Sequence, residues 1–382
     1  GFICKGMRIC YLNRSLKDNS GAGRFFLSLY ASLVKHRPDI ESVVLVSEAG
    51  GNKLEKPIIG TGKFGLFFSI PKIRKVFKKY DIIHALDGWP YGFIAVLASV
   101  GLNKKIIITA IGSGAVQPLY NPFLKPLIEW SYRRADKVVA ISNNTKKEIQ
   151  KFLPNLEIEV INHGVDFEKF QNESADIPQN IKNLKPYILS VGVLKERKGY
   201  EYSIKAFSKI AQKFPNLNYV IFGWDYTSTS SEYSRLKKIV SDLGLSGRVI
   251  FAAYDQQRGF GRKSVSNEEL MGLYKNAELF LLLPQDINKD IEGFGLVFLE
   301  AASCGLPVVS SLGTSAEDAV ADGRNGILVN SKNTDEAASA ISRILSDNDL
   351  RAKFSEESIK FAKEMSWDKA AVSYRRIYRQ LV

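Results

Sequence analysis

The sequence predicts an α/β protein made of two doubly wound lobes, each built on a parallel sheet. The chain has 382 residues, and a domain usually takes roughly 100–200. Short apolar segments alternate with helical patterns along most of the chain, which is typical of parallel sheets. A polar segment near the middle, which contains Pro178 and is followed directly by Pro186, interrupts the alternation. These observations favour two lobes facing each other across a cleft.

The first lobe is predicted over residues 7–169. Its expected strands are short apolar runs, most of them separated by helical patterns such as Arg24–Lys35. The runs are Met7–Leu12, Val43–Val46, Ile82–His84, Ile106–Thr109, Val138–Ile141 and Glu159–Ile161. The longer apolar run Gly92–Leu102 falls short of the roughly 20 residues that span a bilayer. We therefore expect a buried helix there.

The second lobe is predicted over residues 186–366, after a linker at 170–185. Its expected strands are Tyr187–Val191, Tyr219–Phe222, Val249–Phe251, Leu279–Leu283, Pro307–Ser310 and Gly326–Val329. Its expected helices are Gly199–Lys213, Glu232–Leu243, Asn267–Lys275, Leu296–Ser303 and Thr334–Ser346. The last helix, 367–382, has an apolar face, and we expect it to pack back on the first lobe.

The amino-acid composition limits the cellular compartments and the classes of binding partner that fit the chain. Three unpaired cysteines argue against a disulfide framework or a zinc site and favour a reducing cytoplasm. The formal net charge is +13. Part of it lies in a block of Lys72, Arg74, Lys75, Lys78 and Lys79, just after Phe64, Leu66, Phe67, Phe68 and Ile70. Such a segment is typical of a helix that binds an anionic membrane surface, or of the solvated face of an ordinary helix. No motif predicts nucleic-acid binding.

The most informative motif runs from Glu292 to Glu300, between an expected strand and an expected helix. Gly293 and Gly295 allow a ligand to approach the backbone, and the helix start offers free N–H groups to a phosphate. Eight helical residues would span about 12 Å, comparable to the span from a sugar across a diphosphate to a ribose. One carboxylate is suited to sugar hydroxyls and the other to a ribose diol. The alternative is that Glu300 only pairs locally.

Two further turns are candidate phosphate sites. Lys195, Arg197 and Lys198 precede an expected helix start, where cations oppose the helix dipole unless an anion binds. A solvated basic turn is the alternative. Gly21, Ala22 and Gly23 precede the first helix and resemble a phosphate-binding turn, although the later glycine of that pattern is absent. They are equally compatible with a simple helix-start turn.

A fourth candidate region follows the strand at Ile82–His84. His84 and Asp87 are expected at the end of this strand, facing the cleft. Asp87 is suited to orient an acceptor hydroxyl as a catalytic residue. An aspartate before glycine is also common in turns, so a structural role is the alternative.

Together these motifs resemble the family-4 retaining glycosyltransferases of the GT-B fold, including their E-x7-E motif. The resemblance covers nearly the whole chain, and the order and spacing of its motifs are specific. The matching segments are Gly21–Gly23, Ala135–Ser142, Ile161–Asp166, the turn ending at Lys198–Gly199, Phe222–Gly223, Leu273–Glu278, Glu292–Glu300 and Ser366–Asp368.

The resemblance implies a role for each matching residue. Lys198 would neutralise the diphosphate of a nucleotide-sugar donor as the leaving group departs. Glu292 would hold the sugar together with the backbone of Phe294 and Gly295. The N–H groups of Leu296 and Val297 would face the phosphate, and Glu300 would bind the ribose. No metal or other cofactor is expected; the substrate would be a UDP- or GDP-linked sugar.

The chain departs from the family at two positions. Val193 stands where an arginine is usual, so Lys195 or Arg197 is expected to replace it. Ile111 stands where the family has a histidine in its Thr-x-His segment. We expect a cytoplasmic enzyme, peripheral at the inner face of the membrane, whose acceptor is a lipid-linked saccharide or glycolipid precursor. The alternatives are a sugar-nucleotide epimerase, a phosphorylase, or a basic membrane- or nucleic-acid-binding module on an inactive scaffold.

Overall fold

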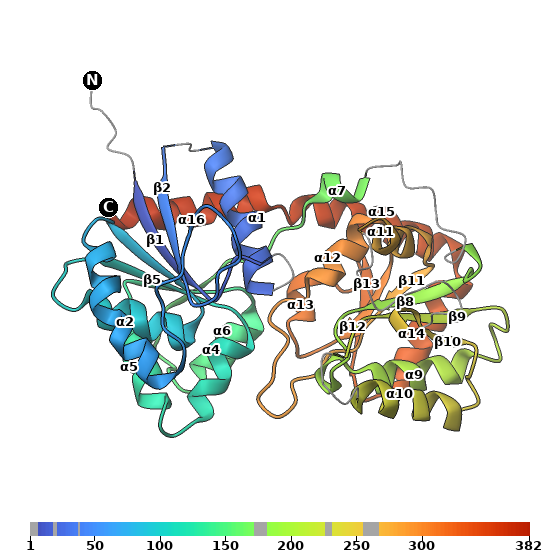
Figure 1. Ribbon diagram of the computed structural model, residues 1–382. Helices are drawn as coiled ribbons and strands as arrows, with labels where there is room; N and C mark the ends of the chain where they lie inside the picture. Colours follow the sequence, from blue (N-terminus) through green and yellow to red (C-terminus); the bar gives the residue numbers. More distant parts are fainter. Residues whose placement is uncertain (1–6, 18–20, 37–38, 172–181, 226–230, 255–266) are drawn as a thin grey trace. The chain divides into compact units, whose positions relative to one another are not determined.

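The computed structural model describes residues 7–17, 21–36, 39–171, 182–225, 231–254 and 267–382 (Figure 1). The chain forms two compact units. Unit 1 comprises Gly1–Gly164 and Trp367–Val382, and unit 2 comprises Val165–Ser366. Most of the segment expected as a linker, 172–181, lies outside the described residues.

The described part of unit 1 contains a sheet in which all pairings are parallel. Its strands lie in the order β3-β2-β1-β4-β5-β6-β7. They are β1 (Arg8–Asn13), β2 (Glu41–Val46), β3 (Glu55–Lys56), β4 (Ile82–Leu86), β5 (Lys105–Ala110), β6 (Lys137–Ala140) and β7 (Ile158–Val160). The chain leaves β1 for one edge and later returns to place β4 on its other side. Ligands of such sheets bind beyond the carboxyl ends of the strands at this reversal.

Helices cover both faces of this sheet (Figure 1). Right-handed crossovers place helices on opposite faces when the strand order reverses. Helix α1 (Gly21–His36) packs with α16 (Trp367–Leu381), whereas α3 (Phe93–Ser99) packs with α2 (Gly62–Phe77) and α5 (Lys125–Arg134). Unit 1 also contains the shorter α4 (Ser113–Val116) and α6 (Asn143–Gln150), with η1 (Gly88–Gly92) and η2 (Gln117–Tyr120).

A buried hydrogen-bond network attaches α16 to the sheet. Tyr378 Oη lies 2.8 Å from His84 Nδ1 and 3.3 Å from Tyr11 Oη. His84 Nε2 lies 2.8 Å from Thr109 Oγ1, which is 3.2 Å from Tyr374 Oη. Burial lowers the pKa of His84 to about 3, so its ring is neutral. The expectation that His84 faces a cleft is therefore wrong, because the side chain is fully buried within the sheet and its hydrogen bonds are satisfied.

Tyr378→Phe is expected to lower the free energy of unfolding by about 1–3 kcal/mol, because it leaves one buried nitrogen of His84 unpaired. Tyr374→Phe is the matched control. Thr109 keeps its bond to His84 in that variant, so the loss should be about 0.5–1.5 kcal/mol. Urea unfolding followed by tryptophan fluorescence measures both. A loss for Tyr378→Phe no larger than that for Tyr374→Phe would contradict the role assigned to His84.

The described part of unit 2 contains a second parallel sheet, in the order β10-β9-β8-β11-β12-β13. Its strands are β8 (Tyr187–Val191), β9 (Asn218–Phe222), β10 (Val249–Phe251), β11 (Leu279–Leu281), β12 (Val308–Ser311) and β13 (Gly326–Val329). The direction of winding reverses between β8 and β11. The prediction of two doubly wound parallel-sheet lobes is thus confirmed.

The helices of unit 2 mostly follow the sequence-based bounds. They are α7 (Phe167–Gln171), α9 (Tyr200–Ile210), α10 (Ser231–Asp242), α11 (Asn267–Asn276), α12 (Leu296–Ser303), α13 (Ala316–Ala319), α14 (Thr334–Ser346) and α15 (Asn348–Glu364). Helices α7, α13 and α15 are additions to the predicted set. In the described part of the chain, every helix is too short or too polar to cross a membrane.

Candidate active site

The turn between β8 and α9 places a lysine in a buried position. A short 3-10 helix, η3 (Glu196–Lys198), ends at Gly199, which has φ 68°. A Cβ at Gly199 would lie 1.7 Å from the carbonyl oxygen of Leu283, so only glycine allows this close approach to the chain after β11. The turn brings Lys198, only 5% exposed, to the carboxyl edge of the sheet.

A small hairpin brings two carboxylates to the same edge. Ile287 and Asp290 exchange backbone hydrogen bonds of 3.1 and 2.8 Å. The two residues between them, Asn288 and Lys289, have φ of 51° and 68°, as a tight turn of this kind requires. The chain thereby reverses within four residues and presents Asp290 and Glu292 before α12.

These elements form an ion cluster of Arg197, Lys198, Asp290 and Glu292. Lys198 Nζ lies 2.7 Å from Glu292 Oε2, which also accepts a hydrogen bond from Arg197 Nη1. Arg197 Nε lies 3.3 Å from Asp290 Oδ2. Burial raises the pKa of Glu292, but the charges of Lys198 and Arg197 outweigh it and hold the pKa below its usual value. Glu292 is therefore ionised, and the two cations are balanced by two carboxylates.

The start of α12 adjoins this cluster in sequence. Gly295 has left-handed backbone angles (φ 82°, ψ 58°), and a Cβ there would lie 2.7 Å from the ring of Phe298. The helix begins at Leu296, followed by Val297, and the first N–H groups of a helix have no acceptor within it. Phe294 is 2% exposed and anchors the loop. A glycine-led helix start of this kind is suited to an anion.

Glu300 lies in the second turn of α12 and is also buried. Its Oε2 accepts a hydrogen bond of 2.8 Å from Tyr274 Oη, on α11. The local pairing considered from sequence is therefore present. A carboxylate oxygen has further acceptor capacity beyond one hydrogen bond, so the contact with Tyr274 is compatible with a ligand contact.

The three cationic residues of the turn between β8 and α9 occupy different environments. Arg197 and Lys198 join the ion cluster, whereas Lys195 is exposed and takes no part in it. Between the two candidates to replace the arginine missing at Val193, the arrangement favours Arg197. In the described part of the chain, no group of three or more His, Cys, Asp and Glu side chains is placed to hold a metal ion.

Other candidates belong to unit 1. Gly21, Ala22 and Gly23 are the first residues of α1, and Asn13 Nδ2 donates to the carbonyl oxygen of Ala22 at 3.3 Å. This contact joins the end of β1 to the helix start. Their proposed role in phosphate binding stays a prediction.

Asp87 follows β4 in an unusual environment. Its φ is 124°, which is rare outside glycine, and Oδ1 accepts a 2.8 Å hydrogen bond from the N–H of Gly88. The N–H of Ile111 is a second donor. The carboxyl group packs so closely on Gly114 that a Cβ there would lie 1.9 Å from Oδ2. Burial raises the pKa of Asp87 to about 8, and the two backbone donors only partly offset this.

We expect Asp87→Asn to remove a pH dependence from both activity and stability. If carboxylate Asp87 orients the acceptor, kcat/KM of the wild type rises with pH through about 8, and the variant loses this rise. The folded-state pKa of Asp87 lies above its unfolded value of about 3.9, so the free energy of unfolding of the wild type falls as pH rises from about 4 and levels off above about 8. The variant should therefore gain stability relative to wild type between pH 5 and pH 9. One unit of pKa shift is already about 1.4 kcal/mol.

Urea unfolding at pH 5 and pH 9 measures the stability effect, and initial rates across the same range measure the activity effect. A stability difference between the proteins that does not change with pH would show that the carboxyl of Asp87 titrates normally.

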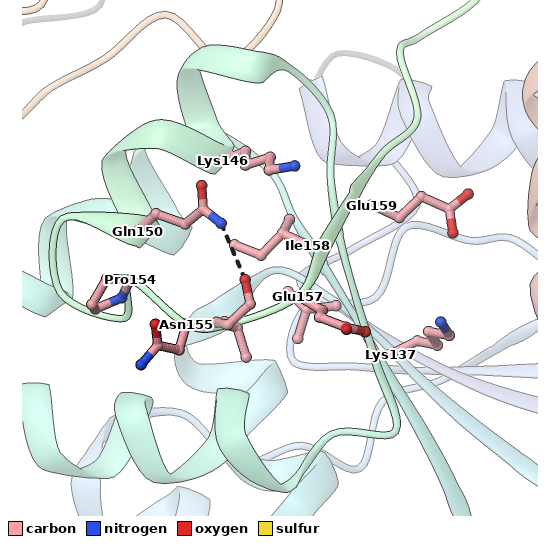
Figure 2. Close-up of a pocket in the computed structure, with 10 residues that line it drawn as sticks. Lys137, Lys146, Gln150, Pro154, Asn155, Glu157, Ile158 and Glu159 are labelled. Atoms are coloured by element: carbon pink, nitrogen blue, oxygen red, sulfur yellow. Dashed lines mark hydrogen bonds between the residues drawn. The ribbon is translucent and has the colours of Figure 1, made fainter.

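Two open cavities lie away from these residues. Figure 2 shows one of about 510 Å³ lined by residues at the starts of β6 and β7, including Lys137, Glu157 and Ile158. Gln150, which also lines it, donates a 3.1 Å hydrogen bond to the carbonyl oxygen of Leu156. A second, of about 370 Å³, lies beside the start of β8 at Pro186. Both lie at the amino ends of strands, opposite the edge that holds the candidate site.

Several residues of the site were missed by sequence analysis. Asp290 and Tyr274 contact the candidate residues Arg197 and Glu300. The turn at Asn288–Lys289 lacks the glycine that usually identifies a tight hairpin, so the sequence held no clear indication of it. The position of Glu292 against Arg197 and Lys198 likewise required the folded chain.

Comparisons with known proteins agree in fold and family. Residues 171–361 match the family described as Glycosyl transferases group 1, and residues 19–169 match Glycosyltransferase Family 4. An uncharacterized glycosyltransferase of Methanocaldococcus jannaschii is 26% identical over 301 residues, covering 79% of this chain and 76% of that protein. A D-inositol 3-phosphate glycosyltransferase of Corynebacterium urealyticum is 28% identical over 322 residues, covering 79% and 72%.

A solved structure of similar fold is that of Anabaena HepE in complex with UDP-glucose. It superposes with a TM-score of 0.78 at 19% sequence identity, covering 98% of this chain and 100% of that one. At this identity the likeness concerns the fold.

Proposed function

The chain belongs to the group 1 glycosyltransferases with the GT-B fold, and on this premise we propose that it is a retaining enzyme that uses a nucleotide diphosphate sugar, UDP- or GDP-linked, as donor. The ion cluster of Arg197, Lys198, Asp290 and Glu292 is the observation that carries this proposal. Two cations at a buried sheet edge, followed by a glycine-led helix start, form a site suited to a diphosphate.

The chemistry places the largest charge change on the leaving group. As the bond from the sugar to the diphosphate breaks, negative charge grows on the diphosphate oxygens, and Lys198 and Arg197 stabilise it. The N–H groups of Leu296 and Val297 contribute at the helix start. Glu292 binds hydroxyls of the sugar while holding both cations in place. Glu300 binds the ribose, and its contact with Tyr274 fixes its orientation.

Unit 1 is proposed to handle the acceptor. Asp87 is the residue proposed to orient the acceptor hydroxyl, and Gly21, Ala22 and Gly23 are proposed to contribute backbone N–H groups to phosphate binding. The acceptor class is a lipid-linked saccharide or glycolipid precursor, reached at the inner face of the membrane.

Helix α2 supports this acceptor class. Phe64, Phe67 and Phe68 are 80%, 71% and 73% exposed near its start. Lys72, Lys75, Lys78 and Lys79 are exposed in and just after its second half. Exposed aromatic rings insert at a bilayer interface while basic side chains attract anionic lipid headgroups.

Thermal shift and donor hydrolysis test the proposed activity. We expect a UDP- or GDP-linked sugar to stabilise the protein, by about 2.7 kcal/mol at 100-fold its Kd, and to be slowly hydrolysed when no acceptor is present. Conversion of the donor to an epimer, or phosphorolysis of a saccharide, would favour the epimerase or phosphorylase alternatives. Absence of binding to every nucleotide sugar would favour an inactive scaffold.

Co-sedimentation with vesicles tests the membrane surface. Wild type should bind vesicles with 30 mol% phosphatidylglycerol and not pure phosphatidylcholine, and a Phe64→Ser, Phe67→Ser and Phe68→Ser variant should lose binding. Leu243→Ser is the control, since Leu243 is 40% exposed on unit 2. Equal binding by all three proteins would remove α2 from the proposal.

A further inference from the structure

Gln285 is a buried amide that lacks the hydrogen bonds its position requires. Its side chain is 3% exposed, and neither Oε1 nor Nε2 has a hydrogen-bond partner among the described residues. Buried polar groups in folded proteins are nearly always paired. Leaving such a group unpaired costs about 1–3 kcal/mol per atom, so a residue of this kind calls for an explanation other than stability.

The backbone of Gln285 ties it to the ion cluster. Its N–H donates a 2.8 Å hydrogen bond to the carbonyl oxygen of Arg197, the residue whose guanidinium group binds Glu292. Gln285 lies two residues beyond Leu283, against which the turn at Gly199 packs. It therefore sits in the wall of the candidate donor site.

Unpaired buried groups gather at this edge of the unit 2 sheet. In the described part of unit 2, buried side-chain atoms without a hydrogen-bond partner occur in Gln285, Ser311, Ser315 and Asn325, and in Arg197, whose Nε is ion-paired with Asp290 at 3.3 Å. All but Asn325 follow or end the neighbouring strands β8, β11 and β12 at their carboxyl ends. Ser310 Oγ donates a 2.9 Å hydrogen bond to the carbonyl oxygen of Leu282, which joins β12 to the residue just after β11.

The chemistry of these groups selects the ligand. An amide offers two N–H donors and a carbonyl acceptor, and a serine hydroxyl both donates and accepts. A diphosphate only accepts, so it would leave Gln285 Oε1 unpaired. Neighbouring sugar hydroxyls donate and accept, and they satisfy both atoms of the amide.

We propose that Gln285, together with Ser311 at the end of the neighbouring strand β12, binds hydroxyl groups of the transferred sugar. This subsite rests on the proposed function, since it assumes that a nucleotide-sugar donor binds the ion cluster. It makes Gln285 a determinant of which sugar is accepted. A site built to bond a hydroxyl discriminates strongly against a ligand that lacks it, because the buried amide is then left unpaired.

The test replaces the amide by an apolar side chain of similar length. Calorimetric binding of UDP-glucose, GDP-mannose, UDP and GDP is measured for wild type and Gln285→Met. We expect the variant to bind the nucleotide sugar about 5- to 100-fold more weakly, and the matching free nucleotide within about twofold of wild type. Its urea midpoint without ligand should equal or exceed that of wild type, because an unpaired amide has been removed.

Two serine variants extend the test. Ser311→Ala should weaken binding of the nucleotide sugar by about two- to tenfold. Ser99→Ala removes another buried, unpaired hydroxyl, from unit 1, and should leave binding unchanged.

The inference is overturned if Gln285→Met binds the nucleotide sugar as tightly as wild type does. It is also overturned if the variant loses the same affinity for the nucleotide sugar and for the free nucleotide. If the wild type binds none of the four probes, the donor site itself is wrong and the sugar subsite falls with it. Binding by wild type and Gln285→Met alike removes only the subsite.

Discussion

Lys198→Ala is expected to lower kcat by about 100- to 1,000-fold while the protein stays folded. The loss is large because the charge on the diphosphate grows as the sugar leaves, and a preorganised cation stabilises that change most in the transition state. Lys198 is 5% exposed and 2.7 Å from Glu292, so its charge is held in place before the donor binds. Glu292 keeps Arg197 as a partner in the variant. Destabilisation should therefore stay below the roughly 3–5 kcal/mol of a fully broken buried ion pair.

Arg197 and Lys195 provide the comparison. Arg197→Ala should show a second large loss of kcat, because its side chain shares Glu292 with Lys198. Lys195→Ala should stay near wild type in rate and within about 0.5 kcal/mol in stability, as usual for an exposed side chain. Steady-state rates at saturating donor measure all three. Full activity of Lys198→Ala would show that the diphosphate does not bind at this turn.

The fold could be predicted because its determinants are local and repeated. Strands such as Tyr187–Val191 are apolar runs bounded by glycine and polar residues, and their alternation with amphipathic helices specifies parallel sheets. The final helix showed its apolar face in its own sequence, and residues of that face, including Tyr374 and Tyr378, are buried. Helix α2 was harder to predict, because its exposed phenylalanines obscure the helical periodicity.

The site could be predicted only where a residue's neighbours in sequence also surround it in space. The turn ending at Lys198 and the start of α12 are of this kind. The pairing of Arg197 with Glu292 joins positions 95 residues apart, and the unpaired amide of Gln285 depends on what surrounds it after folding. His84 was misassigned for the same reason, since its partners Thr109 and Tyr378 come from distant elements.

Substitutions of Glu292 and Glu300, the two glutamates of the α12 segment, should have different effects on turnover and on nucleotide binding. Glu292→Gln removes one of the carboxylates that balance Arg197 and Lys198. The ion cluster then has a net positive charge, so we expect UDP or GDP to bind as tightly as in wild type or more tightly. Turnover should fall, because the sugar loses a charged acceptor for its hydroxyls. Weaker nucleotide binding by Glu292→Gln would contradict this balance of charges.

Glu300→Gln is expected to weaken nucleotide binding by roughly 1.5–3 kcal/mol, the contribution of a hydrogen bond to a charged group. This corresponds to an increase in Kd of about 10- to 150-fold, with kcat at saturating donor little changed, because the ribose lies away from the bond that breaks. Tyr274→Phe is the control. It removes the 2.8 Å hydrogen bond from Tyr274 to Glu300 and leaves the carboxylate of Glu300 intact, so the loss should be smaller. Calorimetric titration with UDP and GDP measures both variants. Equal nucleotide affinity in wild type and Glu300→Gln would show that Glu300 serves only its pairing with Tyr274, because a carboxylate that binds the ribose cannot lose its charge without weakening that contact.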